Sequence, residues 1–137
     1  MSSKELADKI ADIIFSKKGY DVKILDLRSL TTIADYFIIC SADSDIQVKS
    51  ISDEIDKNLR DEGIKNWHKE GLKGLTWVLM DYVDVVVHVF KKDVRQFYNL
   101  EKLWGDAPLV ELVDPLLQAT QKAIGKKTER KRTKSSE

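Results

Sequence analysis

Cysteine, histidine and long apolar runs are scarce in this chain of 137 residues, and each scarcity excludes a class of protein. Cys40 is the only cysteine, so no internal disulfide can form, and with two histidines the chain is a poor source of zinc ligands. No apolar run approaches the roughly 20 residues that cross a bilayer. The first residues mix charged with apolar side chains, unlike a secretory signal. We therefore expect one reduced, cytoplasmic domain with no membrane segment.

Catalytic and phosphate-binding motifs are missing as well. The sequence has neither of the two common glycine-rich phosphate loops. Cys40 stands in an apolar stretch, where a free thiol usually behaves as a small buried hydrophobe, and nothing in the sequence connects it to His88. Asp81 and Asp84 flank a predicted turn, and strand alternation does not require them to converge on a metal. We therefore predict that the chain is not an enzyme and that it holds neither a metal nor a cofactor.

Charge is balanced overall but unevenly distributed. The chain has 23 basic and 23 acidic residues, yet residues 125–137 contain six lysines or arginines against two glutamates. The preceding body therefore has 17 basic and 21 acidic residues. The basic end has no apolar side chain to bury, so we predict a disordered tail over 126–137. Such a tail either keeps the protein in solution or adds a weak contact to nucleic acid through phosphate.

Helical and strand periodicities alternate through the first 90 residues. Ser2 and Ser44 each begin a capping box followed by apolar residues at helical spacing, and these two helices are expected to end at Gly19 and Gly63. Apolar runs with strand character fill the intervals between and after the helices. The expected strands are residues 21–27, residues 36–42, a short piece at 64–68, and a hairpin of 76–82 with 84–90.

The chain after the hairpin predicts a third helix. Asp93 is expected to cap it, and Gly105 is expected to end it. Phe97, Leu100 and Trp104 would share one face of this helix, which favours a place in the core for Trp104.

These elements together predict the fold class and the organisation of the chain. Helices and strands in this order indicate an α/β fold with a mixed β-sheet and helices packed on it. An Asp-Pro pair at 114–115 predicts a further helix over 113–125. We therefore expect a single α/β domain over 1–112, a C-terminal helix over 113–125 and the basic tail over 126–137.

One histidine lies inside the predicted hairpin, in the run DVVVHVF. Alternate residues of this run share a face, and both faces are apolar, which indicates a central strand. His88 is therefore predicted to be a buried, hydrogen-bonded imidazole or to lie at the rim of a partner surface, rather than to act as a catalytic base.

Two long segments resemble a known family. They read ADYFIICSADSDIQVKSISDEI and EGLKGLTWVLMDYVDVVVHVFKKDVRQFYNLEKLWGDAPLVEL. In this order and over this length they are similar to the ribosomal silencing factors, also called the Iojap-like family. The similarity extends from Leu6 to Leu112, and its most specific parts are Asp35 to Phe37, the hairpin from Trp77 to Phe90, and the sequence RQFYNLEKLW.

The resemblance implies a fold and a function that composition does not indicate. The fold would be a mixed α/β domain related to nucleotidyltransferases without their catalytic carboxylates. The function would be to bind the large ribosomal subunit at its subunit-joining face, through large-subunit ribosomal protein fourteen. Bound there, the protein would sterically block association with the small subunit and repress translation when nutrients are limiting.

The positions that match the family supply candidate partner contacts. Most ribosomal proteins are basic, so an acidic body with aromatic anchors suits such a partner. Core packing is the alternative role for the aromatic candidates Trp77 and Tyr98. The six candidate contacts are Trp77, Asp81, Tyr82, Asp84, Tyr98 and Glu101.

Some questions stay open after the resemblance is taken into account. Val83 stands where family hairpins commonly have glycine, and we expect the turn type to adjust so that this β-branched residue avoids positive φ. The resemblance allows a monomer or a homodimer. A remnant nucleotidyltransferase-like nucleotide-binding protein and an RNA binder acting through the basic tail are the alternative functions.

Overall fold

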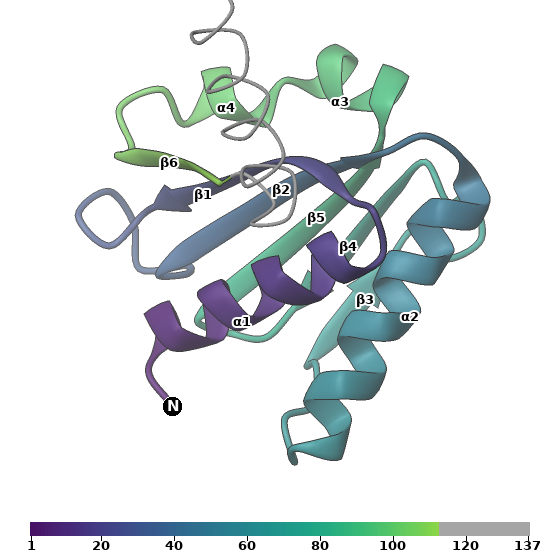
Figure 1. Cartoon of the computed structure of the whole chain (residues 1–137). Helices are drawn as coiled ribbons and strands as arrows, with labels where there is room; N and C mark the ends of the chain where they lie inside the picture. Colours follow the sequence, from purple (N-terminus) through teal and green to yellow (C-terminus); the bar gives the residue numbers. More distant parts are fainter. Residues whose placement is uncertain (113–137) are drawn as a thin grey trace, which may run out of the picture.

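The computed structural model describes residues 1–112, so the predicted helix at 113–125 and tail at 126–137 lie outside the described residues. Two long helices and two strands form the first half, namely α1 (Ser3–Ser16), β1 (Tyr20–Asp26), β2 (Tyr36–Ala42) and α2 (Asp45–Asp61). Shorter elements follow, namely β3 (His68–Glu70), β4 (Trp77–Asp81), β5 (Val85–Lys91), α3 (Lys92–Tyr98), α4 (Leu100–Leu103) and β6 (Leu109–Leu112). Figure 1 shows their arrangement.

The six strands form one mixed sheet in the order β3-β4-β5-β2-β1-β6. β2 and β5 pair in parallel at the centre, and the other neighbours are antiparallel. β5 is buried over six of its seven residues, from Val85 to Phe90, as expected for a central strand covered on both faces. The predicted α/β domain with a mixed sheet is confirmed.

The two faces of the sheet are covered by different helices. α1 and α2 pack on one face, where their apolar stripes meet side chains such as Ile38 and Val87 of the central strands (Figure 1). On the other face, residues of α3 and α4 pack on a smaller cluster that includes Leu25, Ile39 and Phe90. We call the first the helical face and the second the outer face.

Serine caps fix where the two long helices begin. Ser2 Oγ accepts a hydrogen bond from the Glu5 backbone N–H at 3.1 Å, and Ser44 Oγ accepts one from the Gln47 N–H at 3.2 Å. Each serine thereby satisfies a donor that the first helical turn leaves unpaired. The sequence predicted both of these helix starts correctly.

The single helix predicted from Asp93 onward is wrong, because two short helices replace it. Asn99 adopts a left-handed conformation with φ 44°, which ends α3, and its side chain accepts from the Lys102 backbone N–H to cap α4. Asp93 lies within the first turn of α3, while the capping position belongs to Lys91, whose side chain makes no cap.

This break changes which aromatic side chains are buried. Leu100 and Trp104 are partly buried against the outer-face cluster, so the core position expected for Trp104 is largely confirmed. Phe97, predicted to share their buried face, is instead 82% exposed. The left-handed residue between the helices rotates the second helix relative to the first and removes the common stripe.

The sequence-based prediction omitted the edge strand β6 and placed the other edge strand, β3, a few residues too early. β6 pairs antiparallel with β1, from Leu25 opposite Leu109 to Val22 opposite Leu112. Its side chains are mostly exposed, so no alternating apolar pattern marks it in the sequence. The short strand expected at 64–68 lies at His68–Glu70.

Candidate functional site

Strand register places three side chains of β4 on the outer face. Trp77, Leu79 and Asp81 alternate along β4 and therefore point to the same side of the sheet. Their partners on β5 are, in order, Phe90, His88 and Val86. Phe90 belongs to the outer-face cluster, and Trp77 packs against that cluster.

A glycine in the preceding loop fixes the backbone at the start of β4. Gly71 has φ 86°, and a Cβ at this position would lie 1.9 Å from the Trp77 carbonyl oxygen. Only glycine combines this left-handed conformation with such a close backbone approach. The loop therefore holds Trp77 at the beginning of its strand.

Trp77 is positioned by a hydrogen bond to His88. The indole Nε1–H donates to His88 Nδ1 at 3.1 Å, so the neutral imidazole carries its proton on Nε2. Burial lowers the pKa of His88 to about 4, which keeps the ring neutral at physiological pH. Within the described residues, Nε2 is buried without a hydrogen-bond partner. The predicted buried imidazole is confirmed, and it orients an aromatic neighbour.

Two aromatic residues of α3 extend this arrangement toward solvent. The Tyr98 ring lies 4.7 Å from the Trp77 ring, and the Phe97 ring lies 5.2 Å from that of Tyr98, measured between centroids. Tyr98 is 50% exposed and Phe97 82%. With the three outer-face residues of β4 they form what we call the aromatic surface, consisting of Trp77, Leu79, Asp81, Phe97 and Tyr98.

Two of the predicted site residues, Asp81 and Asp84, form hydrogen bonds within the turn after β4. Asp81 Oδ1 accepts from the Val83 backbone N–H at 2.7 Å, and the Asp84 N–H donates to the Tyr82 carbonyl at 2.9 Å. Val83 has φ 72° at the centre of this three-residue γ-turn. The expectation that Val83 would avoid positive φ is wrong, because the Asp81 carboxylate and the i to i+2 hydrogen bond hold it there.

Tyr82 points away from the other candidates. It is 7% exposed and packs in the core of the helical face, on the opposite side of the sheet from Trp77. Burial is also the main cause that raises the pKa of Tyr82 to about 12. The structure therefore does not bring Tyr82 together with the aromatic surface, whereas Asp84 is exposed at the adjoining turn.

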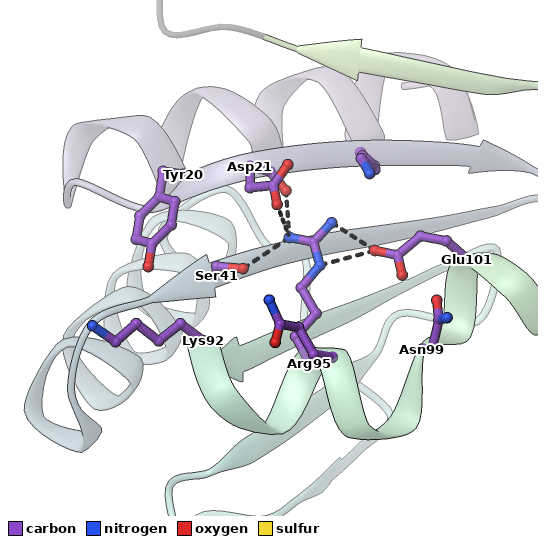
Figure 2. A pocket seen from close by; sticks show the side chains of 9 residues that line it. Tyr20, Asp21, Ser41, Lys92, Arg95, Asn99 and Glu101 are labelled. Atoms are coloured by element: carbon purple, nitrogen blue, oxygen red, sulfur yellow. Dashed lines mark hydrogen bonds and ion pairs between the residues drawn. The ribbon is translucent and has the colours of Figure 1, made fainter.

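Glu101 is engaged inside the protein by a buried arginine. Arg95 is 5% exposed and donates through Nε to Glu101 Oε1 at 2.8 Å, with Nη2 2.6 Å from the same oxygen. Its Nη1 donates to Ser41 Oγ at 2.9 Å and to the carbonyl oxygen of Asp21 (Figure 2). This guanidinium thus joins α3 to α4, β1 and β2. A pocket of about 480 Å³ lies beside it, between Lys92 and these groups.

Three features of the described residues concern nucleophilic chemistry, metal binding and membrane insertion. Cys40 is fully buried, and burial raises the pKa of its thiol to about 12, so no thiolate forms at neutral pH. Residues 1–112 contain no group of three or more His, Cys, Asp or Glu side chains that could hold a metal ion. Over the same range, no helix is long and apolar enough to cross a membrane.

The sequence identified part of the aromatic surface and missed part of it. It selected Trp77 and Tyr98, whose rings the structure brings together, and Asp81, which shares the strand face of Trp77 but lies at the turn end of β4. Leu79 was not among the candidate contacts, although strand alternation places it on the same face as Trp77, and Phe97 was assigned to a helix stripe. The Asn99 residue that breaks that stripe was the available signal, because asparagine tolerates the left-handed conformation.

Comparison with known proteins identifies relatives over most of the chain. A family model described as ribosomal silencing factor during starvation, RsfS, matches residues 1–137. The ribosomal silencing factor RsfS of Halalkalibacterium halodurans is 46% identical over 112 residues, which cover 82% of this chain and 96% of the relative. The chloroplast protein Iojap of Zea mays is 39% identical over 95 residues, or 69% of this chain and 41% of the plant protein.

Solved structures agree with these relatives. A crystal structure of a Chromobacterium violaceum protein superposes with a TM-score of 0.74 at 34% identity, covering 77% of this chain and 88% of that one. A crystal structure from Bacillus halodurans gives a TM-score of 0.71 at 41% identity, covering 80% of this chain and 99% of that one.

The fold and the site define a mixed α/β domain that presents exposed aromatic side chains at one end of the β4–β5 hairpin and the exposed Asp84 at its turn. The chain belongs to the RsfS family of ribosomal silencing factors, proteins of translation regulation during starvation. The ribosome is accordingly its partner.

Proposed function

We propose that this protein binds the large ribosomal subunit on the face that joins the small subunit, with large-subunit ribosomal protein fourteen as its contact. Bound there, it sterically blocks subunit association and so represses translation when nutrients are limiting. The family supports silencing of the ribosome in starvation. The specific contact and the block of subunit joining are our proposal.

The exposure of Phe97 is the observation that carries the proposal. Phe97 contacts the half-exposed Tyr98 with its ring and still leaves 82% of its own surface exposed. Exposed apolar groups that lie together commonly mark protein interfaces, and buried aromatic anchors supply most of the binding energy there. Trp77, held by His88, gives this surface a rigid base.

The charge around the aromatic surface favours a basic protein over RNA. Asp81 belongs to it, Asp84 follows at the exposed turn, and Glu70 on β3 is opposite Leu79 in the strand register. Carboxylates repel RNA phosphate and attract lysine and arginine side chains, mainly accelerating association. A steric block needs only a tight footprint and bulk.

Sedimentation of the full chain with purified ribosomal particles tests the proposal. We expect it to sediment with large subunits, not with small subunits, and to inhibit subunit joining. Phe97→Ala should weaken binding to large subunits about tenfold to thirtyfold, because truncation of a central aromatic anchor typically costs about 2 kcal/mol. Trp77→Ala should also weaken binding, but it lowers stability as well because Trp77 is partly buried.

Ile46→Ala is the matched control for Phe97→Ala. Ile46 is 77% exposed on α2, the helix on the helical face, so it is a comparably exposed apolar residue away from the aromatic surface. Both variants should keep the melting temperature of the unmodified protein. Wild-type affinity in Phe97→Ala, or equal losses in both variants, would contradict the proposal.

The two alternative functions give other outcomes in simple experiments. A nucleotide-binding protein would gain melting temperature when nucleotide and Mg²⁺ are added. An RNA binder acting through residues 126–137 would lose binding when they are removed, and its affinity would fall steeply with salt. We expect truncation after Gly125 to leave large-subunit binding within about tenfold, or roughly 1.4 kcal/mol.

A further inference from the structure

A tryptophan at the β3 edge of the sheet is exposed to solvent. Trp67 lies directly before β3 and is 79% exposed, and neither core cluster of the described residues includes it. β3 is an edge strand of the sheet, on the side opposite β6 (Figure 1). Large aromatic rings supply much of the free energy gained by burial, both in cores and at interfaces. An indole left this exposed is therefore available to a partner.

The backbone around Trp67 is held on both sides. The Trp67 N–H donates to the carbonyl oxygen of Asp81 on β4 at 2.7 Å. Asn66 Nδ2 donates to Asp56 Oδ1 at 2.9 Å, and Lys69 Nζ donates to Asp56 Oδ2 at 3.2 Å, which ties the segment to α2. The ring is thus presented from an ordered backbone, so that binding through it costs little conformational entropy.

The segment that contains Trp67 is basic, unlike the rest of the body. Residues 64–74 contain three lysines and one glutamate, whereas residues 1–63 and 75–124 together contain 14 basic and 20 acidic residues. Lysine side chains attract phosphate and are repelled by other basic surfaces. The charge of this segment therefore favours a polyanionic partner.

Contacts with α2 leave positive charge beside the exposed ring. Asp56 pairs with Lys69 at 3.2 Å and with Arg60 at 2.8 Å, so one carboxylate serves two cations. Lys65 is exposed two residues before Trp67. We call this group the Trp67 edge, consisting of Arg60, Lys65, Trp67 and Lys69.

The neighbouring carboxylates offset only part of this charge. Glu62, which follows α2, pairs with Lys9 of α1, and Glu70 lies 2.8 Å from the imidazole of His68. Asp61 is exposed at the last residue of α2. Together with the shared carboxylate on α2 it faces three cations of the Trp67 edge, which therefore keeps an excess of positive charge.

We propose that the Trp67 edge binds ribosomal RNA, with an unpaired base stacked on the indole and the neighbouring cations against phosphates. Aromatic rings that stack on unpaired bases, combined with basic side chains along the backbone, are a general means of binding single-stranded RNA. The ribosome consists of RNA and of proteins that are mostly basic, so cations that repel the proteins attract the RNA. This inference rests on the proposed binding to the large subunit and adds an RNA contact made by the folded domain.

The Trp67 edge and the aromatic surface can meet the same particle because β3 and β4 are neighbours. The hydrogen bond from Trp67 to Asp81 places the edge beside the turn end of the aromatic surface. Asp81 and Trp77 are four residues apart on β4, or about 14 Å along the strand. The acidic and aromatic groups would then face a basic protein, while the Trp67 edge faces RNA next to it.

Photo-crosslinking from position 67 to purified large subunits tests the inference. Azidophenylalanine replaces Trp67 in the full chain, and Ile46, 77% exposed on α2, is the matched control position. We expect position 67, and not position 46, to form a crosslink to ribosomal RNA that ribonuclease digests. A crosslink from position 67 only to protein, or none while position 97 still crosslinks, would overturn the inference and leave the proposed function standing. Failure of the protein to bind large subunits would overturn both.

Two substitutions of Trp67 separate base stacking from apolar contact. Trp67→Phe keeps an aromatic ring, and Trp67→Leu keeps an apolar side chain without one. We expect large-subunit binding close to that of the unmodified protein in the first variant and about tenfold weaker in the second. Both should keep the melting temperature, because the side chain is exposed. Equal affinities of the two variants would contradict stacking.

A pair of lysine substitutions tests the phosphate contact. Lys65→Gln should lower the slope of log affinity against log salt concentration by about 0.7, the share of one phosphate contact in single-stranded nucleic acid. Lys4→Gln, which removes an exposed lysine on α1, should leave the slope unchanged. Equal slopes in the two variants would contradict a phosphate contact by the Trp67 edge.

Discussion

At the scale of a single residue, His88 connects the stability of the fold with the surface that we propose for recognition. It is enclosed by the rings of Phe37, Trp77 and Phe90, and its Nδ1 accepts the indole proton that fixes Trp77. Because both ring nitrogens of a protonated imidazole are donors, protonation would abolish this hydrogen bond. The sequence predicted burial from the apolar neighbours of His88 along its strand. It could not predict the indole partner, which depends on the register between two strands.

Stability should fall in acid because of His88. Its pKa of about 4 in the folded protein lies below the ordinary value of 6.5, so between these values the unfolded chain takes up a proton and the folded one does not. This histidine should therefore withdraw up to about 3 kcal/mol of stability as pH falls from 6.5 to 4. Urea unfolding of His88→Asn, which keeps an acceptor but does not titrate, should show a smaller loss over that range; equal losses in both proteins would contradict the assignment.

Val83 stores backbone strain in the γ-turn. A β-branched residue is costly at φ 72°, whereas glycine adopts this conformation freely. Val83→Gly relieves this strain in the folded state but increases the conformational entropy of the unfolded chain. We expect a net rise of about 1 kcal/mol in the free energy of unfolding. Thermal and urea unfolding measure this change, and Val83→Ala should give a smaller gain. A less stable glycine variant would mean that the side chain of Val83 contributes packing that outweighs the strain.

At the scale of elements, local sequence signals predict some helices and strands, whereas tertiary contacts decide the α3–α4 unit. The two long helices were predictable because serine caps and apolar stripes agree. The break at Asn99 was harder to predict, because asparagine only tolerates the left-handed conformation, the helix pattern continues across it, and the guanidinium of Arg95, bound to β1 and β2, fixes where α3 lies. β6 escaped prediction because its stabilisation comes from backbone pairing with β1 rather than from a buried face.

Breaking the Arg95–Glu101 pair should loosen this unit. Both side chains are largely buried, at 6% and 18% exposure, so Glu101→Gln would remove the nearer and more buried counter-ion of the guanidinium and leave only the half-exposed Asp21, at 3.5 Å. We expect a loss of about 3 kcal/mol in unfolding free energy. The exposed pair Lys49–Asp53 is the control, since Asp53→Asn should change stability by less than about 0.5 kcal/mol. A comparable small change in Glu101→Gln would show that Arg95 does not hold α3 and α4 in place.

In the molecule as a whole, the main core and the proposed recognition surface lie on opposite faces of the sheet. The helical face contains the larger core, while the outer face has fewer covering residues and exposes Phe97 and Tyr98. Sequence reasoning predicted the mixed α/β domain, and the RsfS family resemblance is confirmed. The composition of the aromatic surface required the structure, because it joins β4 to α3 through contacts that no local pattern records.

Photo-crosslinking from position 97 tests the central claim most directly. Phe97 can be replaced by the photoreactive analogue benzoylphenylalanine with little disturbance, since the side chain is 82% exposed, and Ile46, 77% exposed on α2, provides the matched control position. Irradiation with purified large subunits should link position 97, and not position 46, to large-subunit ribosomal protein fourteen. A crosslink from position 97 only to another ribosomal protein or to ribosomal RNA, or the same crosslink from both positions, would contradict the proposed contact.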